Sequence, residues 1–205
     1  MATMWRATPQ KITSMQGTLR QTVKGAPAVS LDDALFHLRI DSGIEDAYVE
    51  SLIMSVQQEL EPPNGWLGRA LTTSQYQLRL PCFAREIVLP GAPVQSIESI
   101  TYLDDDGVES TVDANVYRLT EDEPASVILN EGSEWPTGLT TRPDAVRINF
   151  TAGFGDDDLS VPEVIRQYML IMIAHRYESR QAAVVGTIVQ PTPYVHNMLE
   201  GWRIR

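Results

Sequence analysis

The spacing of apolar residues changes twice along this chain, and the change limits the folds that the chain can adopt. Apolar side chains recur every three or four positions over residues 30–40 and 43–61, as on the buried face of a helix. Within residues 72–151 they alternate with polar ones in short segments, as strands require. Helical spacing returns over residues 161–180. This order predicts an α+β fold: a small helical bundle (an N-terminal helical hairpin plus a C-terminal helix) with a β-rich insertion.

Signals for the ends of helices support these boundaries. In a capping box, a Ser or Thr side chain accepts a hydrogen bond from a free amide at the start of a helix, and an acidic residue follows three positions later. Three pairs have this spacing: Ser30 and Asp33, Ser42 and Glu45, and Ser160 and Glu163. Pro62, Pro63 and Gly65 end the second helix, and Pro162 suits the first turn of the third, where its missing N–H costs little.

The β-rich insertion is expected to hold six or seven short strands. The clearest alternation places Tyr76, Leu78 and Leu80 between polar neighbours, which indicates a strand with one buried face. The Asp106-Gly107 step suits a tight hairpin between two of the strands. The other expected strands cover residues 87–89, 97–103, 108–112, 117–119, 127–129 and 146–150.

Charge is distributed unevenly over the chain, whose formal net charge is −11. Residues 29–162 hold 24 acidic and 7 basic residues, whereas residues 163–205 hold 3 acidic and 5 basic ones. Residues 1–28 hold 4 basic residues, no acidic residue and no apolar periodicity. We interpret residues 1–28 as a basic, flexible N-terminal arm, either a solvated tail or a segment that lies on an acidic neighbour. The net negative charge argues against broad affinity for nucleic-acid phosphates.

Composition excludes several classes of protein. The longest strongly apolar run, residues 168–174, is far shorter than the ~20 residues that span a bilayer, so no membrane partner is expected. The N-terminus has no apolar core of a secretory signal. Cys82 is the only cysteine, which excludes an internal disulfide and a zinc cluster, and we expect it to be a small buried hydrophobic residue. The sequence therefore predicts a soluble protein of a reducing compartment.

A search for catalytic or ligand-binding motifs finds none that is complete. Residues 153–155 (GFG) lack the third glycine of a dinucleotide-binding fingerprint, so we expect them to end a strand and turn into the last helix. The acidic runs that begin at Asp104 and Asp156 lack the bidentate glutamate of a calcium loop. The three histidines, His37, His175 and His196, share no ligand spacing. We predict no catalytic residue, no metal site and no cofactor; the alternative from another class is a hydrolase that uses acids of the β-rich insertion.

Six short segments follow one another in the order and spacing of a known family. They are residues 30–34 (SLDDA), 37–40 (HLRI), 68–72 (GRALT), 151–155 (TAGFG), 161–163 (VPE) and 175–180 (HRYESR). Together, over about residues 29–190, they resemble the head–tail connector (adaptor) proteins of tailed phages, which sit in the neck next to the portal. Residues 1–28 lie outside the resemblance, and we expect residues 29–180 to form the connector domain.

The resemblance implies a structural protein and not an enzyme. Connector proteins form a homo-oligomeric ring, typically of about twelve copies, beneath the portal protein, and they join the portal to a stopper or tail-completion protein. The ring surrounds the channel through which double-stranded DNA passes without sequence-specific binding. The implied location is the head–tail junction of the virion, reached from the host cytoplasm during assembly. Within the virion, the alternative is another neck component such as a stopper.

Two hypotheses concern surfaces. Part of the acidic segment, residues 29–162, is expected to line the channel and repel phosphate, unless these acids serve solubility alone. Residues 181–205 are expected to form a C-terminal tail that docks onto a neighbouring subunit or the portal, unless they form an intramolecular strap over the core. The residues expected at this partner interface are Val184, Val185, Ile188, Val189, Tyr194, Trp202, Arg203 and Arg205.

Overall fold

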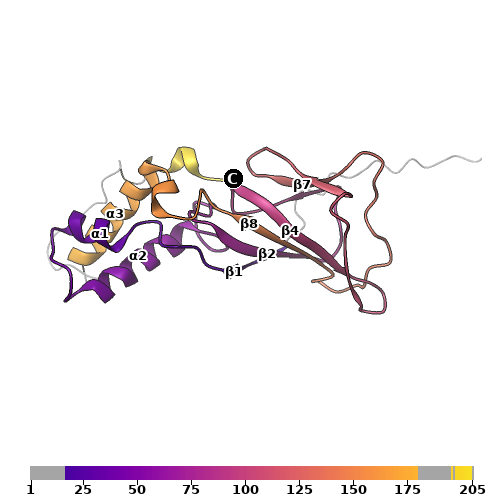
Figure 1. Cartoon of the computed structure of the whole chain (residues 1–205), viewed down its shortest axis with the longest axis horizontal. Coiled ribbons are helices and arrows are strands. Elements are labelled where there is room, and N and C mark those ends of the chain that lie inside the picture. The colour runs from indigo at the N-terminus through magenta and orange to yellow at the C-terminus, as the bar shows by residue number, and fades with distance from the viewer. Residues whose placement is uncertain (1–16, 180–194, 196, 205) are drawn as a thin grey trace, which may run out of the picture.

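The protein is elongated, with helices at one end and two β-sheets at the other (Figure 1). A computed structural model describes residues 17–179, 195 and 197–204. The helices are α1 (Leu31–Leu38), α2 (Asp46–Leu60) and α3 (Glu163–Glu178), and strands β2 to β8 lie between α2 and α3 in the sequence. This order confirms the predicted α+β fold, in which a β-rich insertion interrupts a helical bundle.

The three helices pack around one apolar core. On α2, the buried apolar positions recur every three or four residues from Val49 to Leu60, so that one face of the helix is covered. The facing residues of α3 include Ile165, Met169 and Ile173, each fully buried. An ion pair also links two of the helices at the surface of the bundle: Arg166 of α3 pairs with Asp33 of α1 at 2.7 Å.

Only one of the three predicted capping boxes supplies a side-chain cap in the structure. The Ser30 hydroxyl accepts a hydrogen bond from the Asp33 amide at 3.2 Å, as predicted. The prediction at Ser42 was wrong: Glu45 is the N-cap of α2, and no side chain caps this end. At Ser160 it was also wrong, because Ser160 ends a 3-10 helix, η1 (Asp158–Ser160), and α3 begins after Pro162. The residue at which a helix starts depends on the conformation of the preceding loop. The spacing between a serine and a glutamate in the sequence contains no information about that conformation.

The β part consists of two antiparallel sheets with a second core between them. The five-stranded sheet has the order β1-β2-β8-β4-β5, and the three-stranded sheet has the order β3-β7-β6. Tyr76 and Phe150 stack at a centroid distance of 5.7 Å in this core, beside the fully buried Ile148. The strands are β1 (Thr18–Val23), β2 (Ser74–Leu80), β3 (Glu86–Val88), β4 (Val94–Leu103), β5 (Glu109–Thr111), β6 (Tyr117–Leu119), β7 (Ser126–Leu129) and β8 (Val146–Ala152).

The predicted hairpin between β4 and β5 is confirmed. Asp104 and Val108 close the loop, and Gly107 within it has a φ of 79°, a left-handed conformation that suits glycine. The Asp104 side chain accepts hydrogen bonds from the amides of Asp106 and Val108, at 3.1 and 2.8 Å. The acidic run therefore builds a turn with its first carboxylate.

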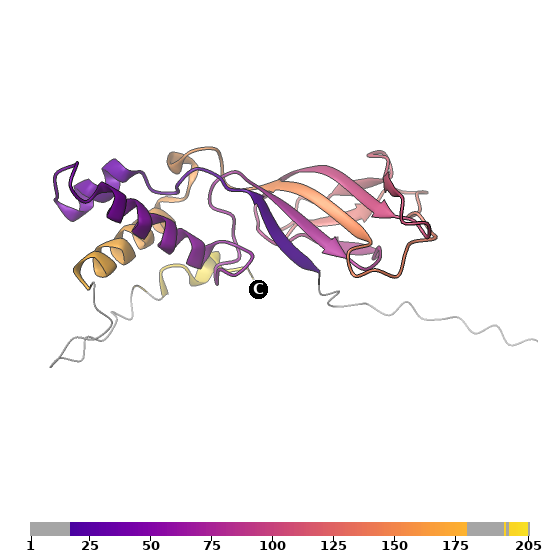
Figure 2. The same cartoon turned by 90° about the horizontal axis from the view of Figure 1, so that it is seen from below.

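The N-terminal segment differs from the expected arm. Residues 18–23 form strand β1, which pairs antiparallel with β2 along one edge of the five-stranded sheet (Figure 2). Of its six residues, Leu19 packs against the β core, and the other side chains lie at least partly in solvent. An edge strand with one inward apolar side chain has no alternation for a sequence pattern to detect. Residues 1–16 lie outside the described residues.

Residues 153–155 turn the chain from β8 into the last helix, as predicted. Gly153 has a φ of 142°, and a Cβ there would lie 2.4 Å from the backbone carbon of Thr72, so no other residue fits without a shift.

Cys82, expected to be buried, is exposed in the connection between β2 and β3, because its small side chain does not determine which way a loop turns. Among the helices of the described residues, none has the length and apolar character needed to cross a membrane.

Candidate assembly surfaces

The helical and β parts meet around residues 67–72, and we call this junction the waist. Arg69 lies at its centre and is only 8% exposed. Its Nε donates a hydrogen bond to the carbonyl of Trp202, and its Nη1 lies 2.8 Å from Glu123 Oε2 in the loop between β6 and β7. The guanidinium also lies over the rings of Phe154 and Trp202, at 6.0 and 5.8 Å from their centroids. One side chain thus connects segments from four parts of the chain.

A buried carboxylate lies on the other side of the same junction. Glu61, at the end of α2, is 7% exposed and accepts a hydrogen bond from the Leu71 amide at 2.9 Å. Burial raises the pKa of Glu61, and hydrogen bonds from Leu71 and Gln57 and the charge of Lys24 only partly oppose this effect. Because Glu61 ends α2 and Leu71 precedes β2, their hydrogen bond helps to fix where the helical part joins the β part.

Gln57 and Thr72 attach the segment before α1 to the waist. The Gln57 carbonyl oxygen accepts a hydrogen bond from the Ala28 amide at 2.9 Å, and Gln57 is itself buried. The Thr72 hydroxyl donates to the Ala26 carbonyl at 2.6 Å. These contacts hold the connection from β1 to α1 against both parts of the molecule.

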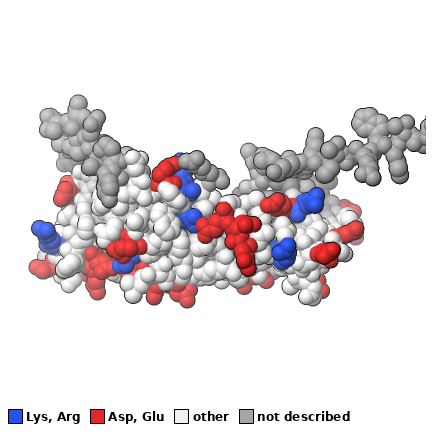
Figure 3. Space-filling model, turned by 90° about the horizontal axis from the view of Figure 1, so that it is seen from above, with Lys and Arg blue, Asp and Glu red and all other residues white. Residues whose placement is uncertain are grey.

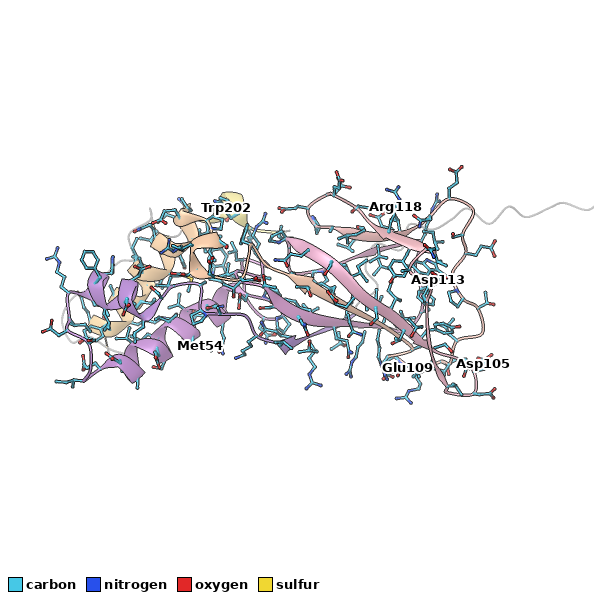
Figure 4. All side chains as sticks on the ribbon, viewed as in Figure 1. Met54, Asp105, Glu109, Asp113, Arg118 and Trp202 are labelled. Atoms are coloured by element: carbon cyan, nitrogen blue, oxygen red, sulfur yellow. The ribbon has the colours of Figure 1, made fainter. Side chains whose placement is uncertain are left out.

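The described end of the predicted docking tail packs on its own chain. Residues 197–204, here called the C-terminal strap, place Leu199 in the helical core with no exposure. Trp202, which is labelled in Figure 4, packs edge-on against Phe154 at a centroid distance of 6.1 Å. The Ile204 amide donates a hydrogen bond to the Leu67 carbonyl. For these residues the structure has the intramolecular strap that was the alternative to docking.

The other residues of the predicted interface divide into two groups. Arg203 belongs to the strap and is exposed. Six residues lie outside the described residues, and their docking stays a prediction; they are Val184, Val185, Ile188, Val189, Tyr194 and Arg205.

Large apolar side chains are exposed on the helical part. Phe36 of α1 is 86% exposed, and Ile44, in the loop before α2, is 98% exposed. Leu159 of η1 is 75% exposed. Exposed side chains of this size are favourable contacts for another protein, although none of them alone defines a site.

The outer face of the five-stranded sheet carries an ordered set of polar side chains, which we call the polar face. Asn149 of β8 accepts a hydrogen bond from Gln77 of β2 and donates one to Ser99 of β4, both at 2.9 Å. Arg79 donates from Nε to the Gln77 side-chain oxygen at 2.7 Å. These hydrogen bonds link side chains of three neighbouring strands, so they hold the side chains of the polar face in fixed positions relative to one another.

Acidic side chains lie along both parts of the molecule, with a few basic ones between them, on the face shown in Figure 3. Within the described part of the chain, no three His, Cys, Asp or Glu side chains gather closely enough to hold a metal ion. The acids of the β-rich insertion therefore offer no such cluster there for a metal-dependent hydrolase.

Sequence reasoning missed the residues that organise the waist. Residues 68–72 entered only as one segment of the family resemblance, and no pattern indicated that Arg69 would meet Trp202, which lies 133 positions later. An arginine beside Ala70 and Leu71 in a short apolar stretch is the only local signal that this charge is buried.

Comparison with known proteins finds similar chains among the solved structures. No protein-family model matches the chain, and no curated protein matches it. Among solved structures, the neck of an empty gene transfer agent (GTA) particle, computed with C6 symmetry, matches with a TM-score of 0.75 and 27% identity. The neck of the native GTA particle, computed with C12 symmetry, matches with a TM-score of 0.69 and 25% identity. A structure of the native GTA virion gives a TM-score of 0.68 and 25% identity.

These matches extend over nearly the whole molecule. Each covers 92% of this chain and 96% of the other chain, so the helical and β parts both belong to the shared fold. The resemblance to phage head–tail connectors that the sequence indicates is thereby confirmed, and this chain has the fold of a neck protein of phage-like particles.

Proposed function

We propose that this chain is a structural subunit of the virion neck, in which about twelve copies form a ring beneath the portal. The single observation that supports this most strongly is the match, over 92% of the chain, to a neck computed with C12 symmetry. In this role the chain joins the portal to a stopper or tail-completion protein and surrounds the DNA channel. It is not an enzyme, in keeping with the necks and virion that it resembles.

The shape of the molecule suits a subunit with several neighbours. Its two cores lie at opposite ends of the molecule, so the helical end and the β end present separate surfaces (Figure 1). The helical part exposes Phe36, Ile44 and Leu159, which suit a protein partner. The acidic segment, residues 29–162, would repel the phosphates of passing DNA where it faces the channel.

The native mass of the purified protein, alone and mixed with its portal protein, tests this function. A species near twelve times 22.9 kDa, or a portal complex heavier by that amount, is the expected result. A chain that stays monomeric and leaves the portal mass unchanged would contradict the proposal. Turnover of a substrate, abolished by one carboxylate substitution in the β part, would favour the hydrolase instead.

The apolar run of the C-terminal tail supplies a second test, of the docking site. Replacing Val184, Val185, Ile188 and Val189 together with serine should weaken portal binding at least tenfold, because apolar anchors contribute most at interfaces. Serine substitutions at Met54 of α2 and Val88 of β3, which are exposed and lie outside the tail and outside strands β1 and β5, form the control. Unchanged portal binding in the tail variant would show that this run is not the docking site.

A further inference from the structure

We infer that neighbouring copies of this chain meet through opposite edges of the five-stranded sheet. Arginines at the β1–β2 edge of one copy would face acidic residues at the β4–β5 edge of the next. The inference rests on the proposed ring, and it names the contact that builds the ring.

The first observation is an accumulation of positive charge at one edge of the polar face. Arg79 of β2 lies directly opposite Arg147 of β8 in the sheet register. Arg20 of β1 lies opposite Gln77, and thus diagonally next to Arg79. Like charges on neighbouring strands repel each other, so this arrangement does not stabilise the sheet by itself.

The second observation is that only one of these three arginines is neutralised. Arg147 pairs with Glu109 and with Asp144, both at 3.0 Å. Within residues 17–179, 195 and 197–204, no carboxylate forms an ion pair with Arg20 or Arg79. We call these two residues the basic edge.

The residues outside the described part of the chain contain no acidic side chain that could pair with the basic edge. All 27 Asp and Glu residues fall within the described part of the chain, so an arm or tail of the same copy brings none. Any acidic side chain that pairs with Arg20 and Arg79 outside the described contacts would therefore come from a second molecule.

The opposite edge of the same sheet has the complementary charge. The β4–β5 hairpin carries Asp104, Asp105, Asp106 and Glu109, which we call the acidic edge. Asp105 and Asp106 are exposed, whereas Asp104 binds amides of its own turn. Figure 4 shows Asp105 and Glu109 at the end of the β part that is far from the helices.

The strand order makes these edges suitable for a ring. Because β1 and β5 are the two outer strands of the sheet, the basic and acidic edges lie on opposite sides of it. A contact between two different surfaces leaves one of each free, and repetition of the contact gives a ring when the rotation between neighbours closes. DNA phosphate is also an anion, but the acidic edge belongs to the same sheet and would repel it.

Charge exchange tests the contact in a mixture with the portal protein. The variant Arg20→Glu/Arg79→Glu would place acid against acid, and Asp105→Arg/Asp106→Arg would place base against base. Each should lose the ring-sized species, with at least a tenfold fall in its amount at equal protein concentration. The variant that carries all four substitutions should regain it, since opposite charges again face each other.

A matched control uses exposed charges on the other sheet and in a loop. Arg118→Glu/Glu131→Arg changes the same kinds of side chain away from both edges and should assemble like the natural chain. Circular dichroism melting of each variant separates lost assembly from lost folding.

The outcomes are distinguishable. Normal assembly of Arg20→Glu/Arg79→Glu would overturn the sheet-edge contact and leave the proposed ring intact; if that variant also lost binding to a short DNA duplex, the arginines would be DNA contacts. Failure of the four-substitution variant to regain the ring would also overturn the pairing. If the natural chain formed no ring with the portal, the proposed function and the contact would both be wrong.

Discussion

At the residue scale, two buried charged side chains set the geometry of the waist. Arg69 contacts the C-terminal strap and the loop before β7, whereas Glu61 accepts a hydrogen bond from the Leu71 amide. Both are nearly covered, so each must keep its partners to avoid the cost of an unpaired buried charge. The strap and the two parts of the molecule therefore depend on these contacts.

Replacing Arg69 with lysine should destabilise the fold although the charge is kept. Lysine cannot bind the Trp202 carbonyl and the Glu123 carboxylate with one planar group, and it loses the flat contact with the two rings. We expect the free energy of unfolding to fall by about 1–3 kcal/mol, measured by chemical denaturation. Arg142→Lys, at an exposed ion pair with Asp144, should change it by less than about 0.5 kcal/mol. Equal effects of the two substitutions would contradict the role given to Arg69.

Glu61 gives a dependence on pH with a defined sign. Because burial raises its pKa above the ordinary 4.5, the folded protein keeps this proton to higher pH than the unfolded chain does. Its contribution to the free energy of unfolding is present below the unfolded pKa and is lost as the pH rises through the folded pKa. The stability of Glu61→Gln relative to the natural chain should therefore increase with pH from about 4.5 upward.

Denaturation curves at several pH values check this sign, with Glu50→Gln, at an exposed position of α2, as the control. The control measures how much of the change comes from replacing any carboxylate of this helix with an amide. A stability of Glu61→Gln that falls relative to the natural chain as the pH rises would show that ionised Glu61 is favoured in the fold.

At the element scale, the N-terminal ends of the helices show which capping residues the sequence predicts correctly and which it does not. Ser30→Ala removes the one capping hydroxyl that the structure confirms and should lower the free energy of unfolding by about 1 kcal/mol. Ser42→Ala, at an exposed serine with the same predicted role, should change it by less than about 0.5 kcal/mol. Thermal denaturation of the two variants compares them directly. A larger loss for Ser42→Ala would mean that α2 begins earlier than the structure shows.

The elements with strong apolar periodicity were predictable, and those held by distant contacts were not. Helices α2 and α3 and strands β2 and β8 follow the expected positions because their buried side chains repeat at a fixed interval. Strand β1 was missed because pairing with β2, and not burial, holds it in place. The strand order of the sheets was also beyond prediction, since it depends on contacts between segments far apart in the sequence.

The candidate surfaces follow the same division. An interface role for the C-terminal tail could be predicted from its apolar and aromatic residues, but the choice between a partner and the protein's own core could not. Among the described residues of the tail, Leu199 packs into the helical core and the Trp202 carbonyl accepts a hydrogen bond from Arg69, and both contacts join segments far apart in the sequence. The basic edge was also missed, because Arg20 and Arg79 become neighbours only through the register of β1 and β2.

At the scale of the whole molecule, two separate cores joined by a buried polar waist make an elongated subunit. The helical end carries exposed apolar side chains, and the sheet carries opposite charges at its two edges. A subunit of this kind can contact copies of itself sideways while its two ends remain free for different partners. This arrangement agrees with the proposed role in a neck ring between a portal and a tail.

The most direct test of the neck assignment is a cryo-electron microscopy reconstruction of the neck of particles that contain this protein. The account predicts one ring of about twelve copies against the portal, with β1–β2 and β4–β5 edges in contact between neighbours. Density for this chain elsewhere in the particle, or its absence from the neck, would contradict the account.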